Sequence, residues 1–394
     1  MTAVRLARGG GVLLLVTVLP ALLLVGCTAR GAASGLGQGA VLAAVEGAIV
    51  PGRPWSRVLI LDWPSLSTSR AWRGQDPAWR PRDEELAFVD YKDARSPRVF
   101  LASPSRVREL CRLPAGSFLQ SWAADGASLY FWAYFGGRLG ILEVSVDGTV
   151  THKWWDPALD VVYLCPSPEG HTLAVGVQRD VVGGTGTGGA GGADICLLPI
   201  PLSSGPLQPW LANGELAFPC GWSPDASRVL YVCGTQRHFA VYTRARHGGR
   251  ETALSAGSAS SSWARWSPAG DRISLVTIEG NTPTAVEVYL VESAKRIHVA
   301  GASPLSPPSW APGGHMLSWV EPRRDANPVL VLLDTDEEKP LPRVAGILPS
   351  GVVRVEWSPR APPLRQPWAE GEPKASGEHP VPKTGVARQA TRPR

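Results

Sequence analysis

The sequence predicts an all-β fold, a β-propeller built from four-stranded blades. A short unit, a tryptophan followed by a tight turn and a strand, recurs along the chain with a period of about 44 residues. That period is typical of one propeller blade. The composition agrees, because 43 Gly, 37 Pro and 16 Trp among 394 residues make a chain rich in turns and in aromatic strand residues.

The unit is clearest in the stretch "WSPDASRVLYV", which begins at Trp222. Ser223 and Pro224 suit the first two positions of a type I turn, because the proline ring fixes φ near the value that this turn needs. The β-branched and aromatic residues from Val229 to Val232 are typical of a strand buried on both faces. Each unit therefore predicts one hairpin of a blade.

Related units start at Trp79, Trp122, Trp266 and Trp310, and a variant without the tryptophan starts at Pro166. Successive starts are 43, 44, 56, 44 and 44 residues apart. The residues seven and nine positions after each start are all apolar, as a buried strand requires. We expect the repeated tryptophans to pack between neighbouring blades; they are Trp79, Trp122, Trp222, Trp266, Trp310 and Trp357.

This pattern resembles the WD40-like, TolB-type β-propeller repeat, whose core is a W-S-P-D-G turn followed by a short apolar strand. The resemblance covers residues 40–360. It implies a propeller and, because TolB-like propellers bind protein partners through one face and the mouth of the channel, a protein-binding role. The chain differs from TolB in lacking a separate N-terminal domain. The resemblance therefore does not predict that this chain binds the protein partner of TolB.

The two ends of the repeat region complement each other. Three N-terminal strands are expected at 44–50, 57–63 and 68–72, without a tryptophan start. Residues 352–360 supply such a start, but Pro362 and Pro363 prevent a continuing central strand. We predict that the C-terminal strand joins the three N-terminal strands and closes a ring of seven blades. Six blades, as in TolB, with the N-terminal strands packed outside, is the alternative.

Residues 1–27 have the layout of a secretory signal, with Arg5 and Arg8 before an apolar run. Leu24, Val25, Gly26 and Cys27 match the bacterial lipobox, and this resemblance implies that Cys27 becomes the lipidated N-terminus. An ordinary signal peptide or an uncleaved anchor is the alternative. Residues 28–39 are small, polar and glycine-rich, which predicts a flexible tether. We expect an extracytoplasmic protein held by lipid at the cell membrane or outer membrane.

Residues 361–394 are rich in proline, have no apolar pattern, and are predicted to be a disordered tail. The formal net charge is +5, but the region between the signal and the tail has equal numbers of acidic and basic residues. The surplus of positive charge lies in the signal and the tail. The net charge therefore does not indicate a nucleic-acid partner.

No motif indicates a catalytic residue, a metal site or a cofactor. Gly184, Gly186 and Gly189 match the G-x-G-x-x-G spacing, but a strand rather than a helix is expected after them, so we interpret the stretch Gly183 to Gly192 as a loop. The seven histidines form no zinc-binding motif, and no G-x-S-x-G motif is present. On this basis we expect the chain not to be an enzyme.

The cysteines offer one candidate disulfide. Cys220 and Cys233 flank the hairpin that begins at Trp222, and the sequence leaves open whether they are bonded. Taken together, these features predict a lipid-anchored, extracytoplasmic propeller that acts as a protein-binding or scaffold module in the bacterial cell envelope. An enzyme or small-ligand receptor with its site in the central channel is the alternative. Acids and histidines in the channel would favour catalysis, and an aromatic rim would favour recognition.

Overall fold

The computed structural model describes residues 41–47, 56–103, 106–179, 192–202, 209–212, 215–235, 238–255, 260–324 and 326–359. They all belong to one compact unit, Met1–Pro363; the second unit, Leu364–Arg394, lies outside the described residues. The predicted signal with Cys27, the tether, the tail and the glycine-rich stretch as far as residue 191 also lie outside them. No helix in the described part of the chain has the length and apolar character needed to cross a membrane.

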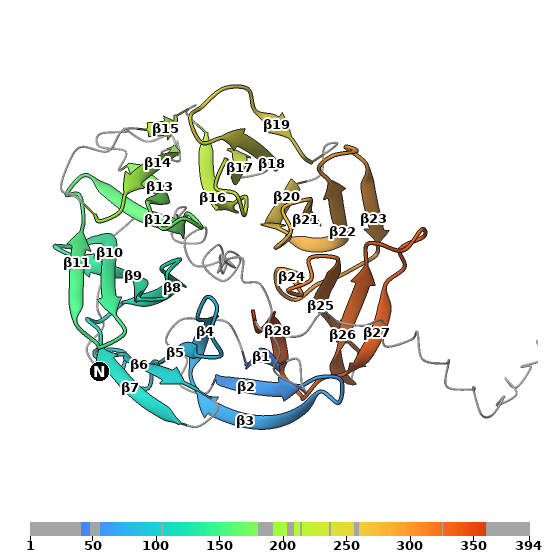
Figure 1. Ribbon diagram of the computed structural model, residues 1–394, viewed down its shortest axis with the longest axis horizontal. Helices are drawn as coiled ribbons and strands as arrows, with labels where there is room; N and C mark the ends of the chain where they lie inside the picture. Colours follow the sequence, from blue (N-terminus) through green and yellow to red (C-terminus); the bar gives the residue numbers. More distant parts are fainter. Residues whose placement is uncertain are drawn as a thin grey trace, which may run out of the picture. The chain divides into compact units, whose positions relative to one another are not determined.

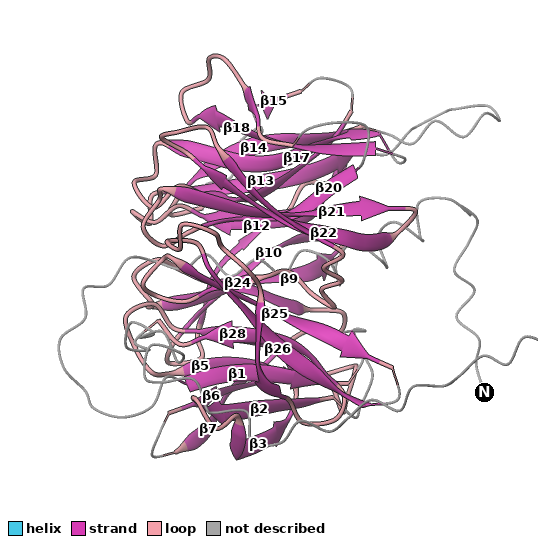
Figure 2. Ribbon diagram, turned by 90° about the vertical axis from the view of Figure 1, so that its right-hand side faces the viewer, coloured by secondary structure: helices cyan, strands magenta, loops and turns pink. Residues whose placement is uncertain are grey.

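The described strands form sheets arranged around a central axis, which is the β-propeller fold that the sequence predicted (Figure 1). Seen from the side, the turns gather on two opposite faces and the strands run between them (Figure 2). Four sheets are meanders in chain order. They consist of β4 (Gln75–Trp79), β5 (Leu86–Asp90), β6 (Arg98–Ala102) and β7 (Val107–Arg112); β8 (Phe118–Trp122), β9 (Ser128–Phe135), β10 (Arg138–Ser145) and β11 (Val150–Trp154); β20 (Ser260–Trp266), β21 (Arg272–Glu279), β22 (Thr282–Leu290) and β23 (Arg296–Ala300); and β24 (Ser309–Trp310), β25 (Met316–Arg323), β26 (Ala326–Asp334) and β27 (Arg343–Ile347).

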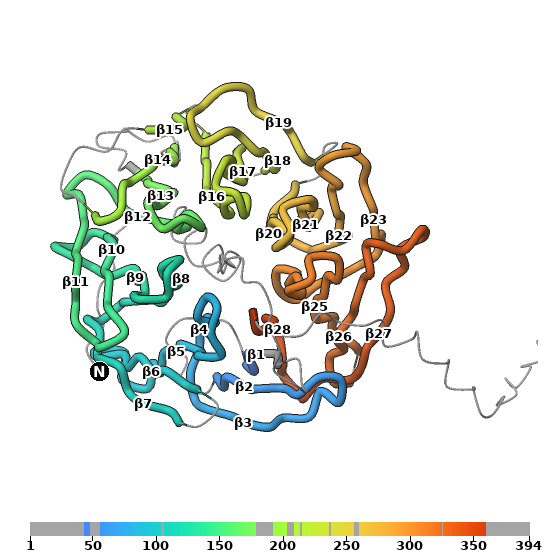
Figure 3. The backbone as a smooth tube through the Cα atoms, viewed as in Figure 1, coloured from blue at the N-terminus to red at the C-terminus, as the bar shows by residue number. Residues whose placement is uncertain are grey.

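A fifth four-stranded sheet joins the two ends of the repeat region. Its order is β28 (Val352–Trp357), β1 (Val41–Glu46), β2 (Arg57–Asp62) and β3 (Ser67–Arg73). β28 and β1 are antiparallel, with Ala44 opposite Val355. Figure 3 shows these two strands near each other although they come from opposite ends of the repeat region. The predicted pairing of the C-terminal strand with three N-terminal strands is therefore present. Without this pairing, β28 and β1 would each have an unpaired backbone edge.

The remaining strands form one eight-stranded sheet. They are β12 (Leu159–Pro166), β13 (Thr172–Arg179), β14 (Ala193–Pro199), β15 (Pro209–Leu211), β16 (Leu216–Trp222), β17 (Arg228–Thr235), β18 (His238–Ala245) and β19 (Thr252–Ala253). The described part of the chain thus has five separate four-stranded sheets, where the sequence predicted seven separate blades or, alternatively, six. The physical reason is a single parallel link between β14 and β16, in which the Ala193 amide donates to the Glu215 carbonyl oxygen at 3.1 Å.

The turns that open the blades have the expected chemistry. The Ala226 amide donates to the Ser223 carbonyl oxygen at 2.8 Å, which closes the turn that Ser223 and Pro224 begin. Oδ1 of Asp225 accepts a hydrogen bond from the Ser227 amide at 3.0 Å. The residue that ends the turn has positive φ in five repeats, and it is glycine in four of these but alanine at 226, where φ is 58°.

The repeat tryptophans connect neighbouring inner strands. Four of them donate an indole N–H to a main-chain oxygen on the preceding inner strand: Trp79 to Glu356, Trp122 to Ala78, Trp222 to Cys165 and Trp310 to Arg265. Trp357 donates to Oγ of Ser318 at 2.8 Å. The buried indole nitrogen of Trp266 has no acceptor among the described residues. Most of these rings thus fix the contact between sheets as well as filling space.

The candidate disulfide between Cys220 and Cys233 is not formed in the structure. Both residues are buried thiols, and across the hairpin Cys233 lies opposite Ala217. Cys220 is the extra residue of a bulge and packs with Leu230 and other side chains on one face of the sheet. Cys233 packs with Tyr231 on the opposite face. Because side chains on opposite faces of a sheet cannot meet, the flanking positions in the sequence were a misleading signal.

Candidate functional site

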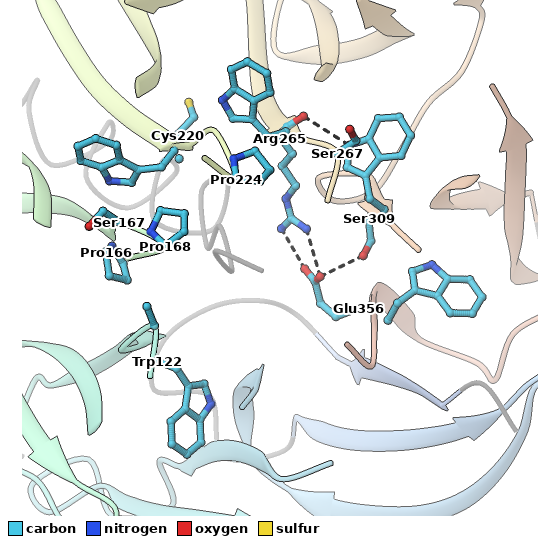
Figure 4. Close-up of a pocket in the computed structure, with 16 residues that line it drawn as sticks. Trp122, Pro166, Ser167, Pro168, Cys220, Pro224, Arg265, Ser267, Ser309 and Glu356 are labelled. Carbon is cyan, nitrogen blue, oxygen red and sulfur yellow. Dashed lines mark hydrogen bonds and ion pairs between the residues drawn. The ribbon is translucent and has the colours of Figure 1, made fainter. Parts of the chain in front are cut away.

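The candidate site is a cavity at the ends of the inner strands, where each strand enters its tryptophan turn (Figure 4). We call it the channel-mouth cavity. Its lining consists of Trp122, Ala124, Pro166, Ser167, Pro168, Cys220, Gly221, Trp222, Pro224, Arg265, Trp266, Ser267, Ser309, Trp310, Glu356 and Trp357. These residues come from six inner strands and the turns after them, so the cavity exists only because the ring brings together segments far apart in the sequence.

Bulges in the inner strands set the direction of the side chains that enter the cavity. In β20 the two residues between Ser262 and Arg265 oppose a single residue on β21, and one of them, Trp263, has a φ of 54°. Register shifts of one residue also occur in β4, β8, β12 and β16. A bulge bends its strand and redirects the residue that follows. In β4, β8, β16 and β20 the following residue is the one directly before the tryptophan, such as Arg265.

Three charged side chains form a cluster at the cavity, and two of them, Arg265 and Glu356, line it. The Glu356 carboxylate accepts from Nη2 of Arg265 at 2.9 Å and from Nη2 of Arg354 at 2.7 Å. Its other oxygen accepts from Nη1 of Arg265 at 3.1 Å and from Oγ of Ser309 at 3.1 Å. All three charged residues are less than a tenth exposed. The two-pronged contact of Arg265 fixes the geometry of the cluster.

The charge of this cluster is fixed over the physiological range of pH. Burial acts to raise the pKa of Glu356, but the charges and hydrogen bonds of Arg265 and Arg354 outweigh it and lower the pKa to about 2. Glu356 is therefore a carboxylate at neutral pH. With two guanidinium groups beside it, the cluster has a net charge of plus one.

A second carboxyl group, Asp76 on β4, interacts electrostatically with Arg354. Tyr91 donates its hydroxyl to Oδ2 of Asp76 at 2.7 Å. Burial raises the pKa of Asp76 to about 6, although the hydrogen bond from Tyr91 and the positive charge of Arg354 act in the opposite direction. Asp76 also has a φ of 54°, in the bulge of β4. Its charge therefore changes just below neutral pH.

Sequence reasoning predicted some of these residues and missed others. Five of the repeat tryptophans line the cavity, and Cys220 lies in its wall. Arg265, Arg354, Glu356 and Asp76 were not singled out. A signal was available for two of them, because the position before the tryptophan is small or apolar in the other repeats but charged at Arg265 and Glu356. No histidine belongs to the described lining.

One trio of potential metal ligands gathers elsewhere in the described part of the chain. His315, Asp334 and Asp336 place ligand atoms within 4.8 Å of one another at the turns beside β25 and β26. Arg272 forms an ion pair with Asp336 and donates to Oγ1 of Thr335 at 2.5 Å. Since this guanidinium already balances the most exposed of the three groups, we assign no metal to the trio.

No family model and no curated protein matches the chain. It is similar in structure to the β-propeller domain of the Trilobed protease from Pyrococcus furiosus, with a TM-score of 0.56, 10% identity, and 82% of this chain and 99% of that chain covered. It is also similar to the periplasmic gluconolactonase of Pseudomonas aeruginosa, with a TM-score of 0.53, 13% identity and the same two coverages. TolB from Acinetobacter baumannii gives a TM-score of 0.48, 15% identity, and coverages of 81% and 82%.

The likenesses to the protease domain and to the gluconolactonase confirm the predicted β-propeller fold and correct one expectation. From the missing motifs we expected that the chain is not an enzyme. That expectation is wrong, because missing motifs do not exclude an enzyme of this fold. A gluconolactonase is an enzyme with the same fold. A propeller assembles its sites from loops and inner strands of several blades, so a local motif is not required for activity.

Proposed function

We propose that this protein is a recognition module that binds a partner protein at the channel-mouth cavity. The observation that carries the proposal is the gathering of Trp222, Trp266 and Trp310 around Arg265 in one concave site. Tryptophan and arginine dominate the binding energy of protein interfaces, because both combine a large contact area with a polar group that orients the partner. Concave sites bury more of a ligand than flat ones do.

In this proposal the apolar and the charged parts of the site contact different groups of the partner. The tryptophan and proline rim accepts an apolar side chain of the partner, and burial of that side chain supplies most of the affinity. The cluster of Arg265, Arg354 and Glu356 has a net positive charge, so an acidic group on the partner is favoured over a basic one. Because the cluster is buried and bonded before the partner arrives, little ordering is needed on binding.

The proposed setting is extracytoplasmic. Cys27, the last residue of the predicted lipobox, would carry the lipid, and residues 28–39 would tether the propeller to the cell membrane or outer membrane. We further propose that the eight-stranded sheet acts as two blades, since among the described residues Ala193 and Leu216 are the one pair in the strand register that links its halves. The ring would then have seven blades, including the one closed by β28.

Site-specific photo-crosslinking tests the partner site. A photoreactive residue at Pro224, on the rim, should give one defined crosslinked protein in native membranes. The same residue at Thr282, the first residue of β22, at the opposite ends of the strands, is the matched control. Pro168→Glu should weaken the crosslink because it adds a negative charge to the rim, and Pro168→Lys should not. Equal crosslinking from Pro224 and Thr282, or none from Pro224, would contradict the proposal.

A second candidate function is an enzyme or small-ligand receptor with its site in the same channel. Asp76 favours it, because a carboxyl group with a pKa of about 6 can give and take protons near neutral pH. The likeness to a gluconolactonase makes a lactone a reasonable first substrate. Hydrolysis of glucono-δ-lactone can be followed by pH-stat. A rate above the uncatalysed one that is abolished by Asp76→Asn would support this function. A rate unchanged by that substitution would show that Asp76 takes no part in the reaction.

A further inference from the structure

A second cavity lies between the sheet that closes the ring and the next sheet. Its volume is about 270 Å³, close to the lower limit for pockets that bind small molecules. Trp72 on β3 and Trp79 on β4 line it, together with the apolar side chains of Ile60 and Leu86. None of its described lining residues belongs to the channel-mouth cavity, so an inference from it does not depend on the proposed function.

The charged groups of this inter-sheet cavity are unequal in number. Asp62 and Glu84 contribute two carboxylates, and Arg70 contributes one guanidinium. Neither carboxylate has an ion pair or a side-chain hydrogen bond within the part of the chain that the structure describes. Arg70 is an exposed residue whose Nη1 donates to the Ser103 carbonyl oxygen at 2.9 Å. With two carboxylates and one guanidinium, the lining of the inter-sheet cavity has a formal charge of minus one.

The tryptophan rings favour a positively charged ligand, as the carboxylates do. The face of an indole ring is the negative end of its quadrupole, and tryptophan is the aromatic side chain that attracts cations most strongly. Trp72 is held in place because it stacks on Phe88 with ring centroids 5.6 Å apart. The indole of Trp79 is fixed by its hydrogen bond to the Glu356 carbonyl oxygen. A cation with an apolar body would satisfy rings, aliphatic walls and carboxylates together.

We propose that the inter-sheet cavity binds a small organic cation, an alkylammonium group with an apolar portion. The apolar portion lies against Ile60 and Leu86, and the charged head lies between the indole rings and the two carboxylates. An anion is disfavoured because it would face both Asp62 and Glu84. The cation has two sources with the same chemistry, a free amine and the side chain of a lysine in a polypeptide.

Ligand-observed NMR with the full-length protein tests this inference. The probes are butyltrimethylammonium as a free cation, N-acetyl-lysine methylamide as a lysine side chain, and pentanol as a neutral apolar control. Asp62→Asn combined with Glu84→Gln removes both charges without changing the size of the cavity. We expect this double variant to bind the cations about tenfold more weakly. Glu338→Gln, at an exposed turn outside the lining, is the matched control and should leave binding unchanged.

Each outcome of the NMR experiment either supports or overturns the proposal. Binding of either cation, weaker in the double variant and absent for pentanol, supports the proposal, and the stronger of the two cations identifies the source. Equal binding of cation and pentanol, no binding of any probe, or an affinity unaffected by the double substitution would overturn it. A thermal midpoint within error of the unmodified protein shows that the double variant is folded. Failure of this test would leave the crosslinking result at Pro224 unaffected.

Discussion

The indole nitrogen of Trp79 lies 3.2 Å from the main-chain oxygen of Glu356, although 277 residues separate them in the chain. This hydrogen bond joins the first tryptophan of the repeat to the last inner strand. The same Glu356 sends its side chain to Arg265 and Arg354 at the centre of the candidate site. The residue that helps to close the ring is therefore also the residue that organises the site, so ring stability and site geometry should change together.

Trp79→Phe should destabilise the protein by about 1 kcal/mol more than Trp266→Phe does. Both substitutions remove a similar apolar area from a partly buried ring, but Trp79 also loses its hydrogen bond to Glu356. The buried indole nitrogen of Trp266 has no acceptor among the described residues, so it has no such bond to lose. Denaturant midpoints of the two variants, measured together, give the difference. Equal losses would show that the closing hydrogen bond adds nothing to stability.

Glu356→Gln should cost about 3–5 kcal/mol at neutral pH, because it leaves Arg265 and Arg354 buried without their counter-charge. The effect should depend on pH. The pKa of Glu356 is lowered to about 2 in the folded protein, so its contribution is complete above the ordinary pKa of a glutamate and is lost as pH falls toward 2.

Thermal unfolding between pH 7 and pH 2.5 measures this contribution. Over that range the free energy of unfolding should fall by about 3 kcal/mol more in the unmodified protein than in the Glu356→Gln variant. Glu338→Gln is the control, since that side chain is exposed and lies outside the site. Parallel pH profiles for the Glu356 variant and the unmodified protein would show that the cluster does not hold Glu356 in its ionised form.

Asp76→Asn should have the opposite dependence on pH. Burial raises the pKa of Asp76 to about 6, so the folded protein holds this proton more tightly than the unfolded chain does. Ionised Asp76 thus destabilises the fold as pH rises from about 4 to 7, by roughly 3 kcal/mol. The asparagine variant avoids that cost and tolerates the positive φ. Its gain in thermal midpoint should therefore be large at pH 7.5 and small at pH 4; a gain independent of pH would contradict the assigned pKa.

The architecture could be predicted because its signals are local and repeated. Ser223 and Pro224 specify a turn within a few residues, and the spacing of the tryptophans places that turn in every blade. The pairing of β28 with β1 was also predictable, since each end of the repeat region supplies only part of a sheet. The link of β14 to β16 was not, because it depends on one hydrogen bond between Ala193 and Glu215.

The candidate site was less predictable for a physical reason. Arg265 and Glu356 are 91 residues apart, and they meet only because the ring brings their strands together and a bulge in β20 turns Arg265 toward the axis. Asp76 depends on a similar bulge in β4. Bulges have no strong sequence signal, so the direction of an inner side chain cannot be taken from simple alternation. The sequence could locate the mouth of the channel through its tryptophans, but it could not identify the charges there.

The thiols give a further prediction. Cys165, Cys196, Cys220 and Cys233 are buried thiols outside any disulfide, so intact mass should not change on reduction and these four should react with a thiol reagent only after unfolding. Burial raises the pKa of Cys220 to about 12, which keeps it as the unreactive thiol. Cys111 is partly exposed and serves as the internal control. A mass increase of two protons on reduction would show a disulfide after all.

Ala226→Gly should stabilise the protein by about 1 kcal/mol. Ala226 ends the turn after Trp222 with a φ of 58°, a conformation that costs an alanine about 1–2 kcal/mol but costs glycine almost nothing. The greater freedom of glycine in the unfolded chain offsets part of this gain. The equivalent position is already glycine in the turns that contain Gly126, Gly170, Gly270 and Gly314.

The reverse change at an equivalent turn is the matched test. Gly270→Ala should destabilise by about 1–2 kcal/mol, because the residue has a φ of 80° and an added Cβ would lie 3.2 Å from Cδ of Pro224. Denaturant unfolding of both variants should therefore give changes of opposite sign. If Ala226→Gly destabilises as well, the entropy of the unfolded chain outweighs strain in this turn, and the alanine in the turn after Trp222 is then the better residue at its position.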